Sequence, residues 1–322
     1  MPSRRIALVA GLIFASLLLG LSLLHAQPES VRWQPLTLPQ ALDKAKTSNQ
    51  RVLVKFDATW CPACKALERE LLSTREGARL TSDMVAVKFD FDTEANRPLI
   101  EQYVVMSLPL VLVLAPDGSE LGRISDYDAK DKWVAQFQAA KVAPDPMPAL
   151  RAAWDKNPTD SRAALALGEA LLVRGQPDQG EALLDRVTWM QGNPEDAAQA
   201  LFLLGRYYQR VRKDPRTARH IWRDLATRFP DSEWASGAWS WYARGEAEIG
   251  HPEVGLEALR AHARKAPESV GAAAQWASFV VKHKLEPERK PAAAAVQAVI
   301  AKATGEDRKE LEELAGKLAA GF

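Results

Sequence analysis

The spacing of hydrophobic residues changes twice along this chain. One apolar stretch without charges runs from Ile6 to Leu24, and short apolar runs of strand length follow between residues 51 and 124. From about residue 149 these runs disappear, and Ala, Leu and Trp recur every three or four residues, which is typical of helices. The pattern predicts a targeting or anchoring segment at 1–26, an α/β domain at 34–143 and an all-α domain at 149–322.

Strand and helix patterns alternate within the α/β domain. Strands are predicted at Arg51–Asp57 and Val85–Asp90, and a β-hairpin at 110–124, whose turn is Pro116-Asp117-Gly118-Ser119. Helices are predicted at 38–45, from about 61 to 72, at 96–103 and at 131–140. This order of elements is typical of a sheet covered by helices on both faces.

The chain has two cysteines, both in the sequence Trp60-Cys61-Pro62-Ala63-Cys64-Lys65. A Cys-x-x-Cys pair just after an apolar strand is typical of a dithiol that cycles between oxidised and reduced forms. A structural zinc site needs about four ligands, and the five histidines lie far from the pair in sequence. We therefore expect a redox-active Cys61–Cys64 disulfide and neither a metal nor another cofactor, with a static disulfide or an inert remnant as the alternative.

The residues after the pair indicate different roles for the two thiols. Leu67, Leu71 and Leu72 continue from Cys64 at helical spacing, which places Cys61 at a helix N-terminus. The partial positive charge and unpaired N–H groups there favour a thiolate over a thiol. We predict that Cys61 is the nucleophile and that Cys64, one turn inside and less exposed, resolves the mixed disulfide. Trp60 would form an apolar wall beside the sulfur.

Residues 34–143 resemble the thioredoxin superfamily. The resemblance rests on the strand that leads to Trp60-Cys61-Pro62-Ala63-Cys64-Lys65, on Ser107-Leu108-Pro109 before an apolar strand, and on the closing helix. With Asp57 before the pair and Glu68 after it, the motif is most similar to the C-terminal periplasmic domain of DsbD-type reductases. The resemblance implies a cis Leu108–Pro109 bond facing the dithiol and a Leu108 backbone that pairs with extended substrate. Taken alone, Pro109 would be expected to follow a trans bond.

Two positions depart from the pattern of common thioredoxins, Lys55 and Pro62. Many thioredoxins carry a buried acid where this chain has Lys55, and a cation there favours a thiolate but cannot act as the same carboxylate base. Glu68, one turn beyond Cys64, is the nearest alternative acid, and a solvated surface glutamate is the competing interpretation. Pro62 and Ala63 form the dipeptide that tunes the reduction potential, in a direction that the sequence does not determine.

Residues 149–322 divide at a near-constant period of roughly 34–37 residues, the length of helix–turn–helix repeats. Units begin near Asn157, Asn193, Pro230 and Pro267, after a stiff linker at Ala143–Pro148. The second unit resembles a tetratricopeptide repeat through its spacing of Leu201, Leu204, Gly205, Tyr208, Ala218 and Trp222. We expect the fourth unit to be degenerate and to cap the stack together with a polar final helix at 307–319.

Stacked helix pairs form a concave surface that commonly binds a peptide or partner protein. Six aromatic side chains could line this groove, although their helical spacing favours the core for most of them: Trp189, Tyr207, Trp234, Trp239, Trp241 and Tyr242. A basic cluster is predicted to be a solvated face: Arg206, Arg210, Arg212, Lys213, Arg216 and Arg219.

The N-terminus is typical of an export signal. Arg4 and Arg5 precede the apolar stretch Ile6–Leu24, and the small residue Ala26 follows it. The stretch is also just long enough to span a membrane, so cleavage after Ala26 and retention as an inner-membrane anchor both remain open, with a buried soluble helix as the alternative. Cleavage and retention both place the rest of the chain outside the cytoplasm, in a bacterial periplasm.

Together these observations predict an extracytoplasmic thiol:disulfide oxidoreductase. The resemblance favours a reductase of protein disulfides that receives electrons from a membrane thiol reductase, with a peptide or protein bound in the repeat groove. With 42 basic and 41 acidic side chains, nothing in the net charge indicates a nucleic-acid partner. The alternative is a non-catalytic envelope scaffold or adaptor whose repeats bind a partner protein.

Overall fold

The computed structural model describes residues 29–142 and 144–322, so the predicted export signal or anchor lies outside the described residues. Backbone contacts divide the chain into two compact units. The first unit holds the described residues up to Asp92 and those from Leu108 to Val142, and the second holds Thr93–Ser107 together with Pro144–Phe322. Within the described part of the chain, no helix has the length and apolar character needed to cross a membrane.

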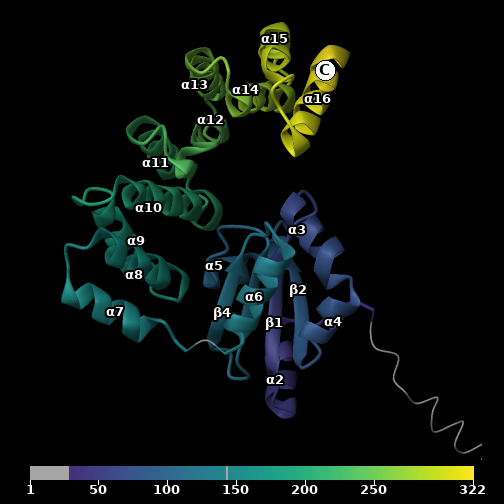
Figure 1. Ribbon diagram of the computed structural model, residues 1–322, viewed down its shortest axis with the longest axis vertical. Helices are drawn as coiled ribbons and strands as arrows, with labels where there is room; N and C mark the ends of the chain where they lie inside the picture. The colour runs from purple at the N-terminus through teal and green to yellow at the C-terminus, as the bar shows by residue number, and fades with distance from the viewer. Residues whose placement is uncertain (1–28, 143) are drawn as a thin grey trace, which may run out of the picture. The chain divides into compact units, whose positions relative to one another are not determined.

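The first unit is built on a four-stranded sheet in the order β2-β1-β3-β4 (Figure 1). β1 (Arg51–Asp57) pairs in parallel with β2 (Met84–Asp90) and antiparallel with β3 (Leu110–Leu114), which pairs antiparallel with β4 (Glu120–Ser125). All five residues of β3 and the five central residues of β1 are buried. Burial on both faces explains why β3 is a continuous apolar run and why β1 is apolar at its buried positions apart from Lys55. The predicted strands and hairpin are confirmed.

Helices cover both faces of this sheet. α2 (Leu38–Ser48) packs on β1 and β2, and its N-terminus is held by a reciprocal capping box between Thr37 and Gln40. On the opposite face lie α3 (Pro62–Leu67), the π-helical turn Glu68–Leu72 and α6 (Lys130–Ala140), whose apolar side chains share one core with Leu53 and Val111. The short helix α4 (Arg75–Leu80) follows the π-helical turn. The predicted α/β fold is confirmed.

The second unit is helical. Its α-helices in the described residues are α5 (Arg97–Gln102), α7 (Met147–Lys156), α8 (Ser161–Val173), α9 (Pro177–Val187), α10 (Pro194–Arg206), α11 (Pro215–Arg228), α12 (Ala238–Glu248), α13 (Pro252–Lys265), α14 (Val270–His283), α15 (Arg289–Val299) and α16 (Gly305–Ala320). From α8 to α15 consecutive helices pack as four pairs. The four predicted unit starts lie shortly before α8, α10, α12 and α14, the first helices of these pairs, which confirms the helical-repeat prediction.

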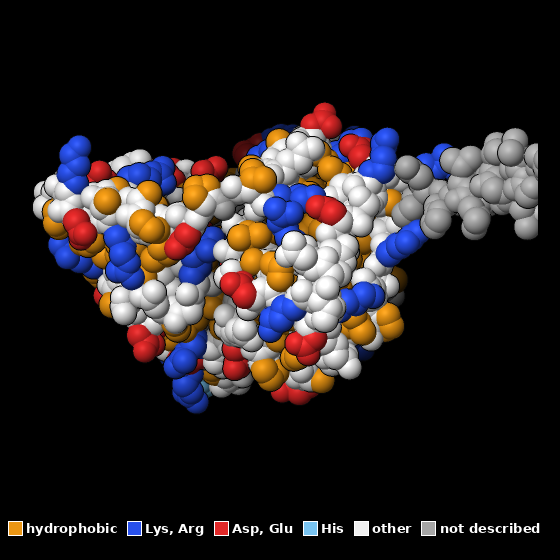
Figure 2. Space-filling view, turned by 90° about the horizontal axis from the view of Figure 1, so that it is seen from below, with side chains coloured by type: hydrophobic (Ala, Val, Ile, Leu, Met, Phe, Trp, Pro, Cys, Tyr) orange, Lys and Arg blue, Asp and Glu red, His pale blue; other side chains and the backbone are white. Residues whose placement is uncertain are grey.

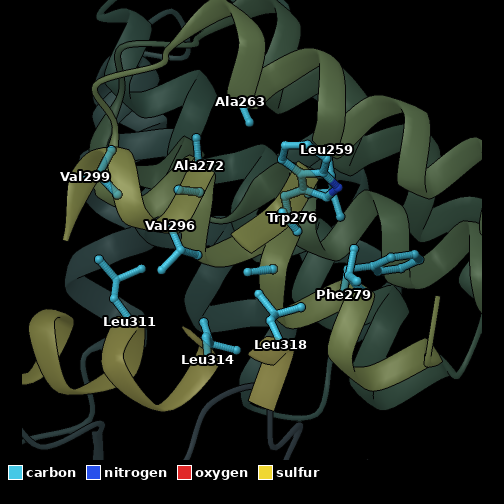
Figure 3. Close-up of a cluster of buried hydrophobic side chains, with 14 of the residues drawn as sticks. Leu259, Ala263, Ala272, Trp276, Phe279, Val296, Val299, Leu311, Leu314 and Leu318 are labelled. Carbon is cyan, nitrogen blue, oxygen red and sulfur yellow. The ribbon is translucent and has the colours of Figure 1, made fainter. Parts of the chain in front are cut away.

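Two predicted features of this unit are wrong. α7 begins at Met147, inside the predicted linker, because Pro148 occupies the first helical turn, where its missing N–H is tolerated. α16 is not polar all round, since Leu311, Leu314 and Leu318 form an apolar stripe. That stripe is buried in the core cluster drawn in Figure 3.

The segment Thr93–Ser107 precedes β3 in sequence and packs with the helical repeats. The Arg97 guanidinium donates hydrogen bonds to the backbone carbonyls of Arg210, at 3.0 Å, and Val211. Val104 lies in the same buried cluster as residues of α8, α9 and α10. The second unit therefore holds the residues that directly precede the Leu108–Pro109 bond.

The aromatic and basic side chains of the repeats follow the sequence interpretation only in part. Tyr207 and Tyr242 are buried in the core, whereas Trp189 is 69% exposed. The prediction of a solvated basic face is wrong for Arg206 and Arg210, whose guanidinium groups lie 5.1 and 5.3 Å from the centre of a Trp241 ring. On the face of the molecule drawn in Figure 2, Lys and Arg are interspersed with Asp and Glu.

A glycine sets the closest approach within the first helix pair. A Cβ added at Gly180 in α9 would lie 2.3 Å from the backbone nitrogen of Leu172 in α8, so one of the helices would have to shift. We expect Gly180→Ala to lower the free energy of unfolding of the helical unit by about 1–3 kcal/mol, measured by urea denaturation.

The matched control is Gly316→Ala in α16, where an added Cβ meets open space. Because alanine is the better helix former, this substitution should raise the free energy of unfolding by up to about 1 kcal/mol. If the two variants unfold at the same urea concentration, the close approach at Gly180 does not limit the packing.

Candidate functional site

The dithiol lies where β1 passes into α3. Cys61 caps the helix, and its Sγ accepts a hydrogen bond from the backbone N–H of Cys64 at 3.0 Å. Pro62 occupies the first helical position, where it costs no backbone hydrogen bond. The prediction that Cys61 lies at a helix N-terminus is confirmed, and its sulfur accepts one of the N–H groups that a helix end leaves free.

Cys61 and Cys64 form a disulfide, with their Cα atoms 5.3 Å apart. Each residue is 3% exposed, so the expected difference in exposure is wrong for this oxidised form. The bond and the Cys64 N–H hold the Cys61 sulfur against the first helical turn, which explains its burial. Among the described residues, no group of three or more His, Cys, Asp or Glu side chains could hold a metal ion.

A carboxylate that the sequence analysis missed holds Trp60. The indole is 50% exposed, and its Nε1 donates a hydrogen bond to Asp92 Oδ2 at 2.6 Å. Asp92 follows β2, the parallel neighbour of β1, and the carboxyl ends of parallel strands meet at one edge of a sheet. The expected parallel pairing of the two strands, together with the acidic residues after Phe89, could have predicted this contact.

The Leu108–Pro109 peptide bond is cis, as the resemblance implied. Both residues are buried and lead directly into β3. In the antiparallel pairing, Leu110 lies opposite Phe56, near the end of β1 that carries the dithiol. Sheet register therefore places the cis bond and the dithiol at the same edge of the sheet.

Lys55 is a buried cation beneath the site, with a side chain that is 1% exposed. Its Nζ lies 2.6 Å from Glu68 Oε2 and 2.9 Å from Asp57 Oδ2. Lys55 is on the same face of β1 as Leu53, which is the face that α3 covers. Lys55, Asp57 and Glu68 line one cavity of about 470 Å³ together with Cys64. The charged groups that the sequence selected are thus brought together beside the second cysteine.

Glu68 is partly buried and ion-paired. Burial alone would raise its pKa, but the hydrogen bond and charge of Lys55 outweigh burial, assisted by the Ser73 hydroxyl at 3.1 Å. The net result is a pKa below the usual glutamate value, so that Glu68 is a carboxylate at neutral pH.

This lowered pKa predicts a contribution of Glu68 to acid sensitivity. Because the folded chain has the lower pKa, the stabilisation is present above the pKa of the unfolded chain and is lost as pH falls through the folded value. Glu68→Gln should reduce the loss of unfolding free energy between pH 7 and pH 3, measured by urea denaturation. The exposed Glu310→Gln serves as the control, and an equal change in both variants would contradict the prediction.

Two family models match the chain. Residues 32–116 match the model described as thioredoxin-like, and residues 136–201 match the model described as a tetratricopeptide repeat. The first range includes the dithiol and the cis-proline bond. The second includes α7, α8 and α9. These matches agree with the α/β unit and the helical repeats seen in the structure.

Curated relatives align with the first unit. "Thiol:disulfide interchange protein DsbD 1" of Pseudomonas aeruginosa is 36% identical over 119 residues, which are 33% of this chain and 20% of that protein. The chain thus spans a fifth of that relative. A thioredoxin of Mycolicibacterium smegmatis is 35% identical over 95 residues, or 80% of its length. The solved oxidised C-terminal domain of DsbD from Neisseria meningitidis is 21% identical over 34% of this chain and 99% of that domain, with a TM-score of 0.29.

Proposed function

Since the chain belongs to the thioredoxin family through its first unit, we propose that it is an extracytoplasmic thiol:disulfide oxidoreductase that reduces disulfides in proteins. The observation that carries this proposal is Cys61 at the N-terminus of α3, disulfide-bonded to Cys64 and accepting the Cys64 N–H. After reduction, that N–H and the helix end favour the Cys61 thiolate, the form that attacks a disulfide.

The reaction exchanges one disulfide for another. The Cys61 thiolate attacks a sulfur of the substrate disulfide, forms a mixed disulfide and releases the first substrate sulfur as a thiolate, which takes up a proton. The Cys64 thiol then loses its proton and attacks Cys61 Sγ. The mixed disulfide breaks, the second substrate thiol leaves, and the Cys61–Cys64 disulfide holds the two-electron oxidation.

Neighbouring residues support these steps. Glu68 lines the same cavity as Cys64 and is held in its ionised form by Lys55, so it would accept the proton that Cys64 loses. Lys55 also places a positive charge beneath the site, which favours thiolates. The Leu108 backbone, at the same sheet edge as the dithiol, would pair with an extended stretch of substrate, and Trp60, held by Asp92, would flank its apolar side chains.

The relatives and the N-terminus support the proposed location and partners. The charge-free stretch Ile6–Leu24 behind Arg4 and Arg5 supports export or an inner-membrane anchor. The relatives named thiol:disulfide interchange proteins support thiol:disulfide exchange as the reaction. Thiols outside the cytoplasm tend to be reoxidised, so the chain would need a membrane thiol reductase as its electron donor. The repeats would bind the substrate or the redox partner.

The proposed direction is tested by the reduction potential. We expect a value below about −200 mV, nearer to the roughly −270 mV of thioredoxin than to the roughly −120 mV of a strong periplasmic oxidant. The measurement equilibrates the purified full-length chain with glutathione buffers and counts the free thiols by mass spectrometry. A value near −120 mV would identify an oxidant instead.

A further inference from the structure

A cavity of about 430 Å³ opens in the second unit along α9, α10 and α11. Figure 1 shows α10 between α9 and α11, the second helices of two successive pairs. Leu201 and Leu204, buried in α10, and Ile221 in α11 supply apolar surface, and Trp189 lies at the edge. None of these residues takes part in the dithiol chemistry. Because four carboxylates also line this cavity, we call it the acidic groove.

Carboxylates line the acidic groove from two helices. Asp178, Glu181 and Asp185 recur on α9 at intervals of three and four residues, so they lie on one helix face. Asp224 lines the cavity from α11, where its carboxylate is ion-paired with Arg228 at 3.6 Å. The one histidine in the lining, His220, has a pKa lowered by partial desolvation and then by Arg219 and Arg223, so it is uncharged at neutral pH. The lining residues therefore carry a net negative charge.

An exposed aromatic side chain accompanies these carboxylates. The Trp189 side chain is 69% exposed, compared with 50% for Trp60. The Arg228 guanidinium lies 4.1 Å from the centre of its ring and donates to the Thr188 carbonyl, so the indole is supported on one side. A partly held, exposed tryptophan next to an apolar floor is typical of the anchor residues in protein interfaces.

We propose that the acidic groove binds an extended protein segment in which a Lys or Arg stands next to an apolar side chain. The carboxylates of α9 attract the cation, and Leu201, Leu204 and Trp189 bury the apolar neighbour. This inference deepens the proposed function. It rests on that function in one respect, which is that the bound segment belongs to a substrate or redox partner. Binding itself requires neither cysteine.

The test measures peptide binding to the purified full-length chain with its disulfide intact. Fluorescein-labelled GSLKLKLSG should bind saturably, and GSLELELSG should bind at least about tenfold more weakly, by fluorescence anisotropy. Asp178→Asn combined with Asp185→Asn should weaken the lysine peptide about fivefold to tenfold, and Trp189→Ala about tenfold or more. Circular dichroism checks that each variant is folded.

The matched control removes two exposed carboxylates outside the groove, Glu253→Gln with Glu306→Gln, whose side chains are 69% and 87% exposed. This double variant has the same net charge as the groove variant and should bind like the unmodified chain. Equal binding of the two peptides, an equal loss in the control, or no saturation by about 1 mM lysine peptide would overturn the inference. Repeating the titration with Cys61→Ser separates this outcome from any failure of the redox proposal.

Discussion

A Cys64→Ser variant will accumulate mixed disulfides between Cys61 and its substrates, whereas Cys61→Ser will form none. Cys61 carries the sulfur that accepts the helix N–H, and without Cys64 no intramolecular thiol can displace the captured substrate. Reduced variants would be mixed with an oxidised protein substrate, quenched with acid and analysed by non-reducing electrophoresis and mass spectrometry. Disulfide exchange by Cys61→Ser should fall to the uncatalysed rate.

The paired variants distinguish the two thiols. Both remove one sulfur, and both abolish the Cys61–Cys64 disulfide, so loss of that bond affects each equally. Trapping by Cys61→Ser but not by Cys64→Ser would reverse the assigned roles. If neither variant traps a substrate, neither cysteine acts as the nucleophile and the proposed mechanism is wrong.

Replacing Lys55 with methionine will destabilise the first unit and slow its thiol chemistry. The substitution leaves Asp57 and Glu68 facing a buried apolar group in place of an ammonium within 3 Å. Because both carboxylates are partly exposed, we expect a loss of about 2 kcal/mol in the free energy of unfolding, less than for a fully buried pair. Removal of the cation should also raise the thiol pKa, so that alkylation of the reduced chain requires a higher pH.

Lys88→Met is the matched control, since Lys88 lines the same cavity but is exposed on β2. This variant loses the same charge but breaks no ion pair of a buried lysine. It should change the free energy of unfolding by no more than about 0.5 kcal/mol. Urea denaturation and the pH dependence of iodoacetamide alkylation are measured for both variants. An identical alkylation profile in the Lys55 variant and the unmodified chain would show that the buried cation does not favour the thiolate.

The sequence predicted the parts of the fold that are specified locally. β3, and β1 apart from Lys55, are apolar at their buried positions because both faces are buried. The helical spacing that begins just after Cys61 indicated that it caps α3. The repeat boundaries followed from the Asn and Pro residues that separate successive helix pairs. In each of these cases, neighbouring residues in the sequence are sufficient to identify the structure.

Features that depend on residues distant in sequence were missed. Asp92 reaches Trp60 across 32 positions, and only the parallel pairing of β1 and β2 brings them together. Arg206 and Arg210 were expected in solvent but stack on Trp241, which comes from a different helix pair.

The most direct measurement is insulin reduction by dithiothreitol in the presence of catalytic amounts of the full-length chain. The mechanism predicts turbidity from precipitating insulin B chain well before dithiothreitol alone produces it, and background behaviour when Cys61→Ser replaces the unmodified chain. Should the unmodified chain give no acceleration over dithiothreitol alone, the dithiol does not catalyse exchange. The helical repeats would then be the functional part of the molecule.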